Sequence, residues 1–293
     1  MRRAILLFVA ALLLVSVVGV QASAAPPTRH IYWSNWVDGT IGRANLDGTG
    51  VRQDFITGIT GSGGPTALAA DSKFIYWGTY MTGDGNGWIG SIGRARLDGR
   101  QVDSNFITPD SGVQGLAVDS RYIYWGNWFA GTIGRARLNG KQVDQSFITN
   151  ASSPFGVAVD DQHVYWVNGN NETDSTIGRA NLDGTGVDQS FIAGDYLYGV
   201  AVDSAHIYWT DYIGYYPPYG PGYIGRANLD GSDVDETLVT TTTGNLGDIV
   251  VDDGYLYWAN ANGTVARANV DGSGLDEDFI TGGSVTWDVA VGG

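Results

Sequence analysis

The stretch GLAVDSRYIYWGNWFAGTIGRARLNGKQVDQSFI, residues 115–148, contains one full copy of the pattern that decides the fold. Its centre is the pair Tyr124-Trp125, and turn residues separate its four short apolar runs. The pair recurs along the chain at intervals of 41 to 49 residues. The six copies are Tyr32-Trp33, Tyr76-Trp77, Tyr124-Trp125, Tyr165-Trp166, Tyr208-Trp209 and Tyr257-Trp258. Self-similarity with a period of this length is typical of repeat architectures.

Each copy carries the same elements in the same order. An Arg-Ala pair follows Tyr-Trp, then an Asp-Gly or Asn-Gly turn, then a run such as Phe147-Ile148. A small-residue run such as 115–119 precedes the next copy. Asp-Gly or Asn-Gly between apolar runs is a strong hairpin signal. Four short strands per unit, six times over, predict an all-β six-bladed propeller of four-stranded antiparallel blades.

The units resemble the YWTD repeat, which is the class B repeat of the low-density lipoprotein receptor, over residues 31–291. Only Tyr208-Trp209-Thr210-Asp211 has all four letters. Elsewhere the fourth letter is Asn35, Thr79, Asn127, Asn168 or Asn260. An Asn accepts similar hydrogen bonds without charge, so we expect the structural role of this position to survive.

The family resemblance also implies an order of strands. The small-residue strand is expected to lie innermost, with Tyr-Trp second. The last small-residue strand, Val285–Val291, has no later partner, so we expect it to complete the first blade and close the ring. In extracellular receptors of this family, the face with the variable loops carries ligands.

The N-terminal segment is expected to be a signal peptide. Arg2 and Arg3 precede an apolar run of 17 residues from Ala4 to Val20, and Ala22-Ser23-Ala24 fits a small-residue cleavage site. A retained anchor is the alternative, since this length is the short limit for a span. The expected organisation is a signal peptide at 1–24, a short linker at 25–30 and the propeller at 31–293, with no further membrane span.

The composition narrows the classes of partner. The formal net charge is −15, which disfavours binding to nucleic acid or anionic membranes and favours a cationic partner or plain solubility. Cysteine is absent, so thiol catalysis and cysteine metal sites are excluded. A disulfide-free exported chain is more typical of a secreted bacterial protein than of an animal receptor ectodomain. We expect a secreted monomer.

The repeat explains several side chains that otherwise suggest catalysis. His30, His163 and His206 each precede a Tyr-Trp strand, where other units have Phe or Tyr. A planar side chain at a structural turn explains them better than a catalytic triad or a histidine metal site. The repeated arginines are expected to pair with repeated acids and bridge strands or blades. These acids are Asp71, Asp119, Asp160, Asp203 and Asp252.

Function is expected where the units differ. The loop after Tyr-Trp and the link from the fourth strand to the next unit vary in length, and both emerge on one face of an up-and-down blade. Variable loops on a rigid scaffold usually carry binding sites. We predict ligand contacts from Trp36, Trp88, Trp128 and Tyr216, which belong to an aromatic set that also includes Tyr80, Phe129 and Tyr212. Packing of the loops against one another is the alternative.

A second variable position lies at the mouth of the axis. The residue before each small-residue register is Thr66, Gln114, Phe155, Tyr198, Gly247 or Trp287, and we take Gln114, Phe155, Tyr198 and Trp287 as candidate ligand contacts. The register itself begins with an acid in two units, Asp248 and Asp288. We expect these acids near the opening, where they and the aromatics would hold a Lys, Arg or amine group. Solvated carboxylates are the alternative.

These observations favour a non-enzymatic extracellular module that binds a protein or a glycan. The alternative is a metal-dependent six-bladed lactonase or lyase with a cation in the channel. Asp248 and Asp288 are weak candidates for its metal ligands, and the sequence offers no convincing third and fourth ligand. A structural matrix protein is a third option. No cofactor is expected. The segments 84–87 and 170–174 are oxygen-rich in a way that suits Ca²⁺, but neither completes an EF-hand pattern.

Overall fold

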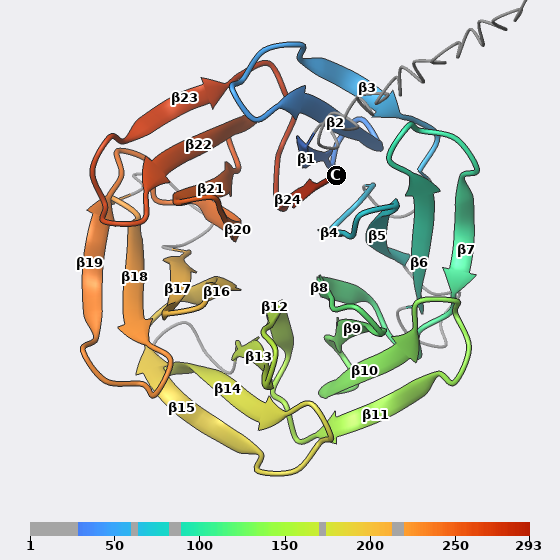
Figure 1. Cartoon of the computed structure of the whole chain (residues 1–293), viewed down its shortest axis with the longest axis vertical. Coiled ribbons are helices and arrows are strands. Elements are labelled where there is room, and N and C mark those ends of the chain that lie inside the picture. Colours follow the sequence, from blue (N-terminus) through green and yellow to red (C-terminus); the bar gives the residue numbers. More distant parts are fainter. Residues whose placement is uncertain (1–28, 60–63, 82–88, 170–173, 213–219) are drawn as a thin grey trace, which may run out of the picture.

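The computed structural model describes residues 29–293 except 60–63, 82–88, 170–173 and 213–219. The described residues form six four-stranded antiparallel sheets arranged as blades around a central axis (Figure 1). Blade 1 consists of β24 (Val289–Gly292), β1 (His30–Asn35), β2 (Thr40–Asn45) and β3 (Arg52–Ile56). Blade 2 consists of β4 (Ala67–Ala70), β5 (Phe74–Met81), β6 (Ile89–Arg96) and β7 (Asp103–Ile107). Blade 3 consists of β8 (Val113–Val118), β9 (Tyr122–Asn127), β10 (Thr132–Arg137) and β11 (Asp144–Thr149).

The second half repeats the arrangement. Blade 4 consists of β12 (Pro154–Val159), β13 (His163–Asn168), β14 (Ser175–Asn181) and β15 (Asp188–Gly194). Blade 5 consists of β16 (Leu197–Val202), β17 (His206–Asp211), β18 (Tyr223–Asn228) and β19 (Asp235–Thr240). Blade 6 consists of β20 (Leu246–Asp252), β21 (Tyr255–Asn260), β22 (Thr264–Asn269) and β23 (Asp276–Ile280). The predicted six-bladed fold is therefore confirmed.

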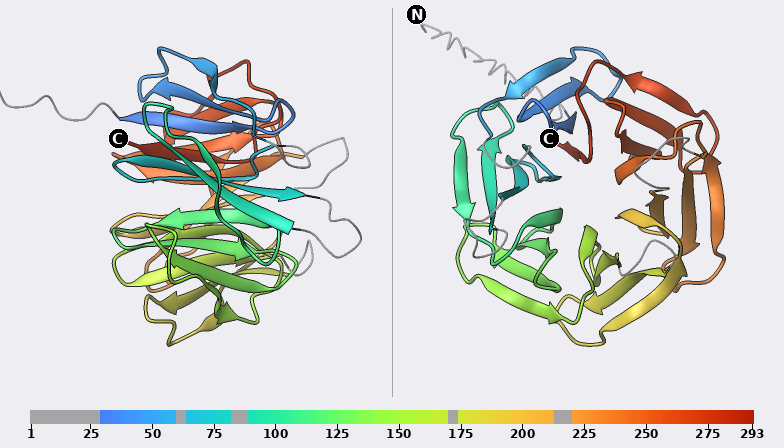
Figure 2. Two further views of the ribbon diagram at one scale, coloured as in Figure 1. Left: turned by 90° about the vertical axis from the view of Figure 1, so that its right-hand side faces the viewer. Right: turned by 180° about the vertical axis from the view of Figure 1, so that it is seen from behind.

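The last strand closes the ring. β24 pairs antiparallel with β1, with Val289 opposite Trp33 and Gly292 opposite His30. Blade 1 thus combines the end of the described chain with its beginning (Figures 1 and 2). The predicted closure is confirmed. The pairing with β24 covers the inner edge of β1, which would otherwise have unpaired backbone groups.

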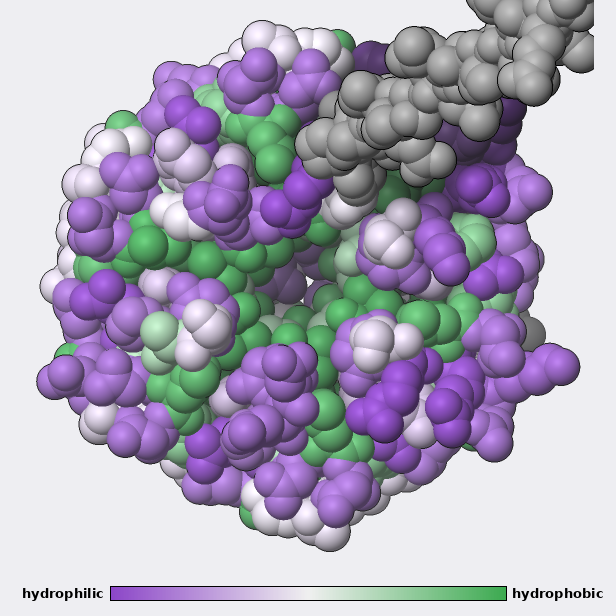
Figure 3. Space-filling view, in the orientation of Figure 1, coloured by the Kyte–Doolittle hydropathy of each residue, from purple (hydrophilic) through white to green (hydrophobic). Residues whose placement is uncertain are grey.

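The Tyr-Trp pairs build the core between the blades. All six tyrosines and all six tryptophans of these pairs are at most 2% exposed. Each Trp faces a small residue on the third strand, as Trp33 faces Gly42. A Cβ at Gly42 would lie 2.1 Å from the Trp33 ring, so the repeated glycine makes room for the indole. Small residues dominate the inner strands, where hydrophobic side chains surround the hollow centre (Figure 3).

The repeated arginines join neighbouring blades, but not through the acids we expected. Arg135 Nη1 donates to the carbonyl of Leu182 in the next blade at 2.8 Å, and its guanidinium carbon lies 3.7 Å from the ring centroid of Phe147. Within the described residues no ion pair joins these arginines to the repeated acids, so the predicted partner was wrong. Asp119 instead accepts a hydrogen bond from the Tyr124 hydroxyl at 3.1 Å. A carbonyl suffices because the guanidinium fork needs acceptors, not charge.

The histidines lie where the repeat predicted. His163 is the first residue of β13, and its ring centroid is 5.9 Å from that of Tyr165. His206 lies at the same distance from Tyr208 in β17. These rings belong to the rim of inner-strand turns, away from the loops that vary.

Candidate binding site

Hydrogen bonds join the two kinds of variable loop on a single rim, which we call the variable rim. In blades 1, 3, 4, 5 and 6 the loop after the Tyr-Trp strand bonds to a link between blades, and the loop of blade 1 does so twice, so both kinds of loop lie on the same side of the ring. The six bonds are Trp36 N to Val285 O, Ile59 N to Gly39 O, Trp128 N to Gly112 O, Gly169 N to Ser152 O, Tyr212 N to Tyr196 O and Ala261 N to Asn245 O.

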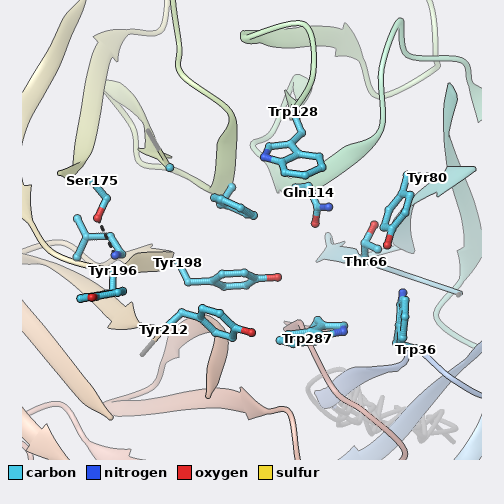
Figure 4. Close-up of a pocket in the computed structure, with 13 residues that line it drawn as sticks. Trp36, Thr66, Tyr80, Gln114, Trp128, Ser175, Tyr196, Tyr198, Tyr212 and Trp287 are labelled. Atoms are coloured by element: carbon cyan, nitrogen blue, oxygen red, sulfur yellow. Dashed lines mark hydrogen bonds between the residues drawn. The ribbon is translucent and has the colours of Figure 1, made fainter. Parts of the chain in front are cut away.

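A cavity of about 480 Å³ opens at the centre of the variable rim, and we call it the aromatic cup (Figure 4). Eight aromatic side chains line it: Trp36, Tyr80, Trp128, Phe155, Tyr196, Tyr198, Tyr212 and Trp287. Thr66, Gln114, Gly169, Ser175 and Leu197 complete the wall. Pockets of this size, largely apolar with a few polar groups, are typical ligand sites.

The aromatic rings of the cup contact one another in a continuous arc. The ring centroids of Trp128 and Phe155 are 5.9 Å apart, and those of Phe155 and Tyr198 are 5.1 Å apart. Tyr198 then lies 5.6 Å from Tyr212 and 6.1 Å from Trp287. These are favourable tilted contacts, so each ring is held in place by the next. The result is a rigid apolar wall.

The backbone explains why Trp287 reaches the cup. A Cβ at Gly247 would lie 2.4 Å from the carbonyl oxygen of Trp287, so blade 6 approaches the link to blade 1 very closely. Asp248 N donates to this same carbonyl at 2.7 Å, and Ser34 Oγ accepts from Trp287 N at 3.0 Å. Trp287 is thereby fixed between the first and last blades.

The polar groups of the cup are neutral. No described residue that lines it carries a formal charge at pH 7. Gln114 and the Tyr198 hydroxyl point toward the middle of the cup (Figure 4). Burial raises the pKa of Tyr198 well above its usual range, and the carboxylates of Asp248 and Asp288 raise it further. The phenol therefore stays protonated and offers a hydrogen-bond donor.

The cup brings together six of the residues predicted from sequence: Trp36, Gln114, Trp128, Phe155, Tyr198 and Trp287. Trp88 and Tyr216 lie outside the described residues, as do 84–87 and 170–173. Tyr80 and Tyr212, which sequence placed in the rim set, also line the cup.

Sequence reasoning missed Tyr196. It has a φ of 57°, a left-handed conformation that large side chains rarely adopt, and its carbonyl accepts from Tyr212 N at 2.6 Å. Its position in the shortest blade link, two residues before Tyr198, was the available signal.

Asp248 and Asp288 lie in the wall of the channel beneath the cup rather than at its opening. They are 6% and 2% exposed, and backbone amides already bind their oxygens. Asp288 Oδ2 accepts from Leu68 N at 2.9 Å, and Asp248 Oδ1 accepts from Ile249 N at 2.8 Å. This arrangement differs from the predicted acidic centre that grips an amine, because the acids face the strands that surround them.

The environment of these two acids disfavours their charge. Burial raises the pKa of Asp248 to about 7, although hydrogen bonds from Ile249 and Val200 oppose the shift. Burial also raises the pKa of Asp288 well above its usual range, and the neighbouring charge of Asp248 adds to this effect. Adjacent inner strands thus share a proton-binding pair inside the ring.

The described residues also bear on metal binding and on membrane crossing. They contain no group of three or more His, Asp or Glu side chains placed to hold a metal ion. They also contain no helix of the length and apolarity that crossing a membrane requires.

The chain is thus a six-bladed β-propeller with an aromatic cavity on its variable rim. Residues 121–160 match the family model described as low-density lipoprotein receptor repeat class B, so the repeat recognised from sequence is confirmed. The chain is therefore a six-bladed propeller in which residues 121–160 match a class B, or YWTD, repeat.

The fold is also found in a solved structure. A chain in the crystal structure of a nidogen/laminin complex is 19% identical, with a TM-score of 0.72, over 90% of this chain and 98% of that chain. The computationally designed Ika8 protein is 16% identical, with a TM-score of 0.45, over 86% of this chain and 72% of that chain. No curated protein matches the chain.

Proposed function

We propose that this protein is a secreted, non-enzymatic binding module whose aromatic cup holds a segment of an extracellular glycan or protein. One observation carries the proposal: eight aromatic side chains from separate stretches of the chain converge on one cavity of about 480 Å³. Since such side chains lose little conformational freedom on binding, a preformed aromatic wall suits recognition.

The surroundings of the cup support binding rather than chemistry. Its lining has no charged group among the described residues, so it lacks a general base or nucleophile with an adjacent activator. The two carboxyl groups beneath the cup, Asp248 and Asp288, are held by backbone amides. The similar chain from a nidogen/laminin complex agrees with a propeller that binds another macromolecule.

The test compares wild-type protein with Tyr198→Ala/Trp287→Ala on glycan and peptide arrays. We expect at least a tenfold loss of affinity for whatever wild type binds, because the two rings lie 6.1 Å apart in the centre of the wall. Equal binding by both proteins rules out the cup as the site.

A matched control removes an aromatic ring from the other rim. Tyr255 is 37% exposed at the start of β21 and stacks on Arg267 rather than on the cup. Tyr255→Ala should keep full affinity. Loss of binding in this variant as well would indicate a general folding defect instead of a lost site.

A further inference from the structure

A second cavity of about 480 Å³ lies beside the aromatic cup, in blade 5. We call it the acidic pocket, because Asp195, Asp211 and Glu236 line it. Trp209 and Tyr223 form part of its wall, and it shares Tyr196 and Leu197 with the aromatic cup. One ligand can therefore reach both cavities across the same two side chains.

The corresponding place in blade 4 is filled by hydrogen-bonded amides. Asn168 Nδ2 donates to Thr176 Oγ1 at 3.2 Å and to the carbonyl of Gln189 at 2.8 Å. Trp166 Nε1 donates to Asn168 Oδ1 at 3.0 Å and to Gln189 Oε1 at 3.1 Å. Gln189 Nε2 in turn donates to the carbonyl of Thr149 in blade 3 at 2.9 Å, so every polar group of this set has a partner.

Blade 5 replaces this set by Asp211, Tyr223 and Glu236 at the same strand positions. A carboxylate has no N–H to donate, so the amide network of blades 1, 3 and 4 cannot form. Asp211 Oδ1 is buried and has no hydrogen-bond partner. Three carboxyl groups also come together with no ion pair to a basic side chain in the described part of the chain.

The tryptophan of blade 5 is also left without an acceptor. Trp209 is 2% exposed and lines the acidic pocket. Its ring sits over Gly225 as that of Trp166 sits over Gly178. Trp166 Nε1 bonds to Gln189, whose strand position Glu236 takes in blade 5, but no hydrogen bond joins Trp209 Nε1 to another described residue. Trp77 and Trp258 Nε1 also lack acceptors, but the cavity lies at Trp209.

The unpartnered groups of the acidic pocket indicate the chemistry of a ligand that would fit it. The carboxyl groups call for a positive charge, since burial and the charges of Glu236 and Asp195 raise the pKa of Asp211 to about 7. The described residues form no metal-binding group of three acids, and the Trp209, Tyr196 and Tyr223 rings suit an organic cation. Trp209 Nε1 in addition needs an acceptor on the ligand.

We propose that the acidic pocket binds the ammonium group of an amino sugar whose neighbouring sugar units occupy the aromatic cup. A lysine ammonium has only donors, whereas an amino sugar carries its ammonium next to hydroxyl acceptors for Trp209. A cavity as large as the cup also fits a ring better than a single side-chain tip. This inference rests on the proposed binding function of the cup and adds the class of its ligand.

Three β-1,4-linked tetramers test the proposal by calorimetry with the full chain at pH 6.5. They consist of glucosamine, N-acetylglucosamine and glucose, so they share a backbone and differ at one substituent. We expect wild type to bind the glucosamine tetramer at least tenfold more tightly than the other two. Asp211→Asn/Glu236→Gln should remove this preference and leave the affinity for the glucose tetramer unchanged.

The double variant restores the Asn and Gln pair found in blades 1, 3 and 4, so it should fold and melt at a higher temperature than wild type. A glucosamine preference that survives in it overturns the proposal, as does equal or absent binding of the glucosamine tetramer by wild type. Tighter binding of trilysine, with the same dependence on Asp211 and Glu236, overturns the sugar assignment. Undiminished binding of all three tetramers by Tyr198→Ala/Trp287→Ala instead contradicts the function proposed for the cup.

Discussion

Blades 4 and 5 have the same four strands, but they differ in the polar side chain at the end of the Tyr-Trp strand and in its hydrogen bonds. At the end of the Tyr-Trp strand, blade 4 has Asn168, which is 2% exposed and satisfied on both sides of its amide. Blade 5 has Asp211, whose Oδ1 is buried without a partner. The blade with the complete Tyr-Trp-Thr-Asp sequence is therefore the one that contains the acidic pocket, whereas in blade 4 the asparagine amide fills the same place.

This contrast corrects our view of the position. We expected asparagine to replace aspartate because its oxygen accepts similar hydrogen bonds. Asn127 and Asn168 do accept from their tryptophans, but each also donates through Nδ2 to a threonine and to a strand-four carbonyl. Donation is the part that a carboxylate cannot reproduce, so the two residues are not equivalent here.

The blades are units of one ring that β24 closes, and removing β24 should have the largest effect on stability. Deleting residues 289–293 removes β24, whose Val289 and Ala290 are 3% and 4% exposed, and leaves β1 without its inner partner. We expect a loss of at least about 5 kcal/mol, or roughly 10–20 °C in melting temperature. Calorimetry checks this, with deletion of Gly293 alone as the control. A melting temperature unchanged by the longer deletion would contradict closure by β24.

The next test imports the chemistry of blade 5 into blade 4. Asn168→Asp loses both Nδ2 donations and places a carboxylate against the carbonyl of Gln189, without a cavity to relieve it. We expect a loss of about 3 kcal/mol in the free energy of unfolding at pH 7. Urea titration measures it. Asn181→Asp is the matched control, since Asn181 is exposed in the same blade and should change stability by less than about 0.5 kcal/mol.

The sequence predicted the scaffold because the repeat averages over six copies. Tyr-Trp, the small residue beneath the indole and the Asp-Gly or Asn-Gly turns recur, so each copy supports the others. The closure by β24 followed from the strand order that the family resemblance implies. The mouth residues Tyr198 and Trp287 could be found because they vary at a fixed register position.

The remaining parts depend on contacts that no register specifies. The buried carboxyl groups of Asp248 and Asp288 accept hydrogen bonds from backbone amides, including that of Leu68 in another blade. Tyr196 enters the cup through a left-handed backbone, and a single sequence does not reveal a φ of 57° at a tyrosine. The acidic pocket likewise requires Asp195, which comes from a link rather than from the repeat. The repeat thus predicts the framework, whereas the aromatic cup and the acidic pocket form from residues that differ between the units.

The smallest expected effect concerns how stability depends on pH. Asp211 has a pKa raised to about 7 in the folded protein, mainly by burial, against an unfolded value of about 3.9. Between these values the folded state binds the proton more tightly, so its contribution to stability is complete below about pH 4 and is lost as pH rises toward 7. Asp211→Asn removes this loss, and so the variant should gain stability relative to wild type as pH rises from 5 to 8. Asp248 and Asp288 act in the same direction but are present in both proteins, so they cancel in the difference. Urea titrations of both proteins at several pH values measure that difference, and a constant value across the range would show that Asp211 is ionised as freely as a solvated carboxyl group.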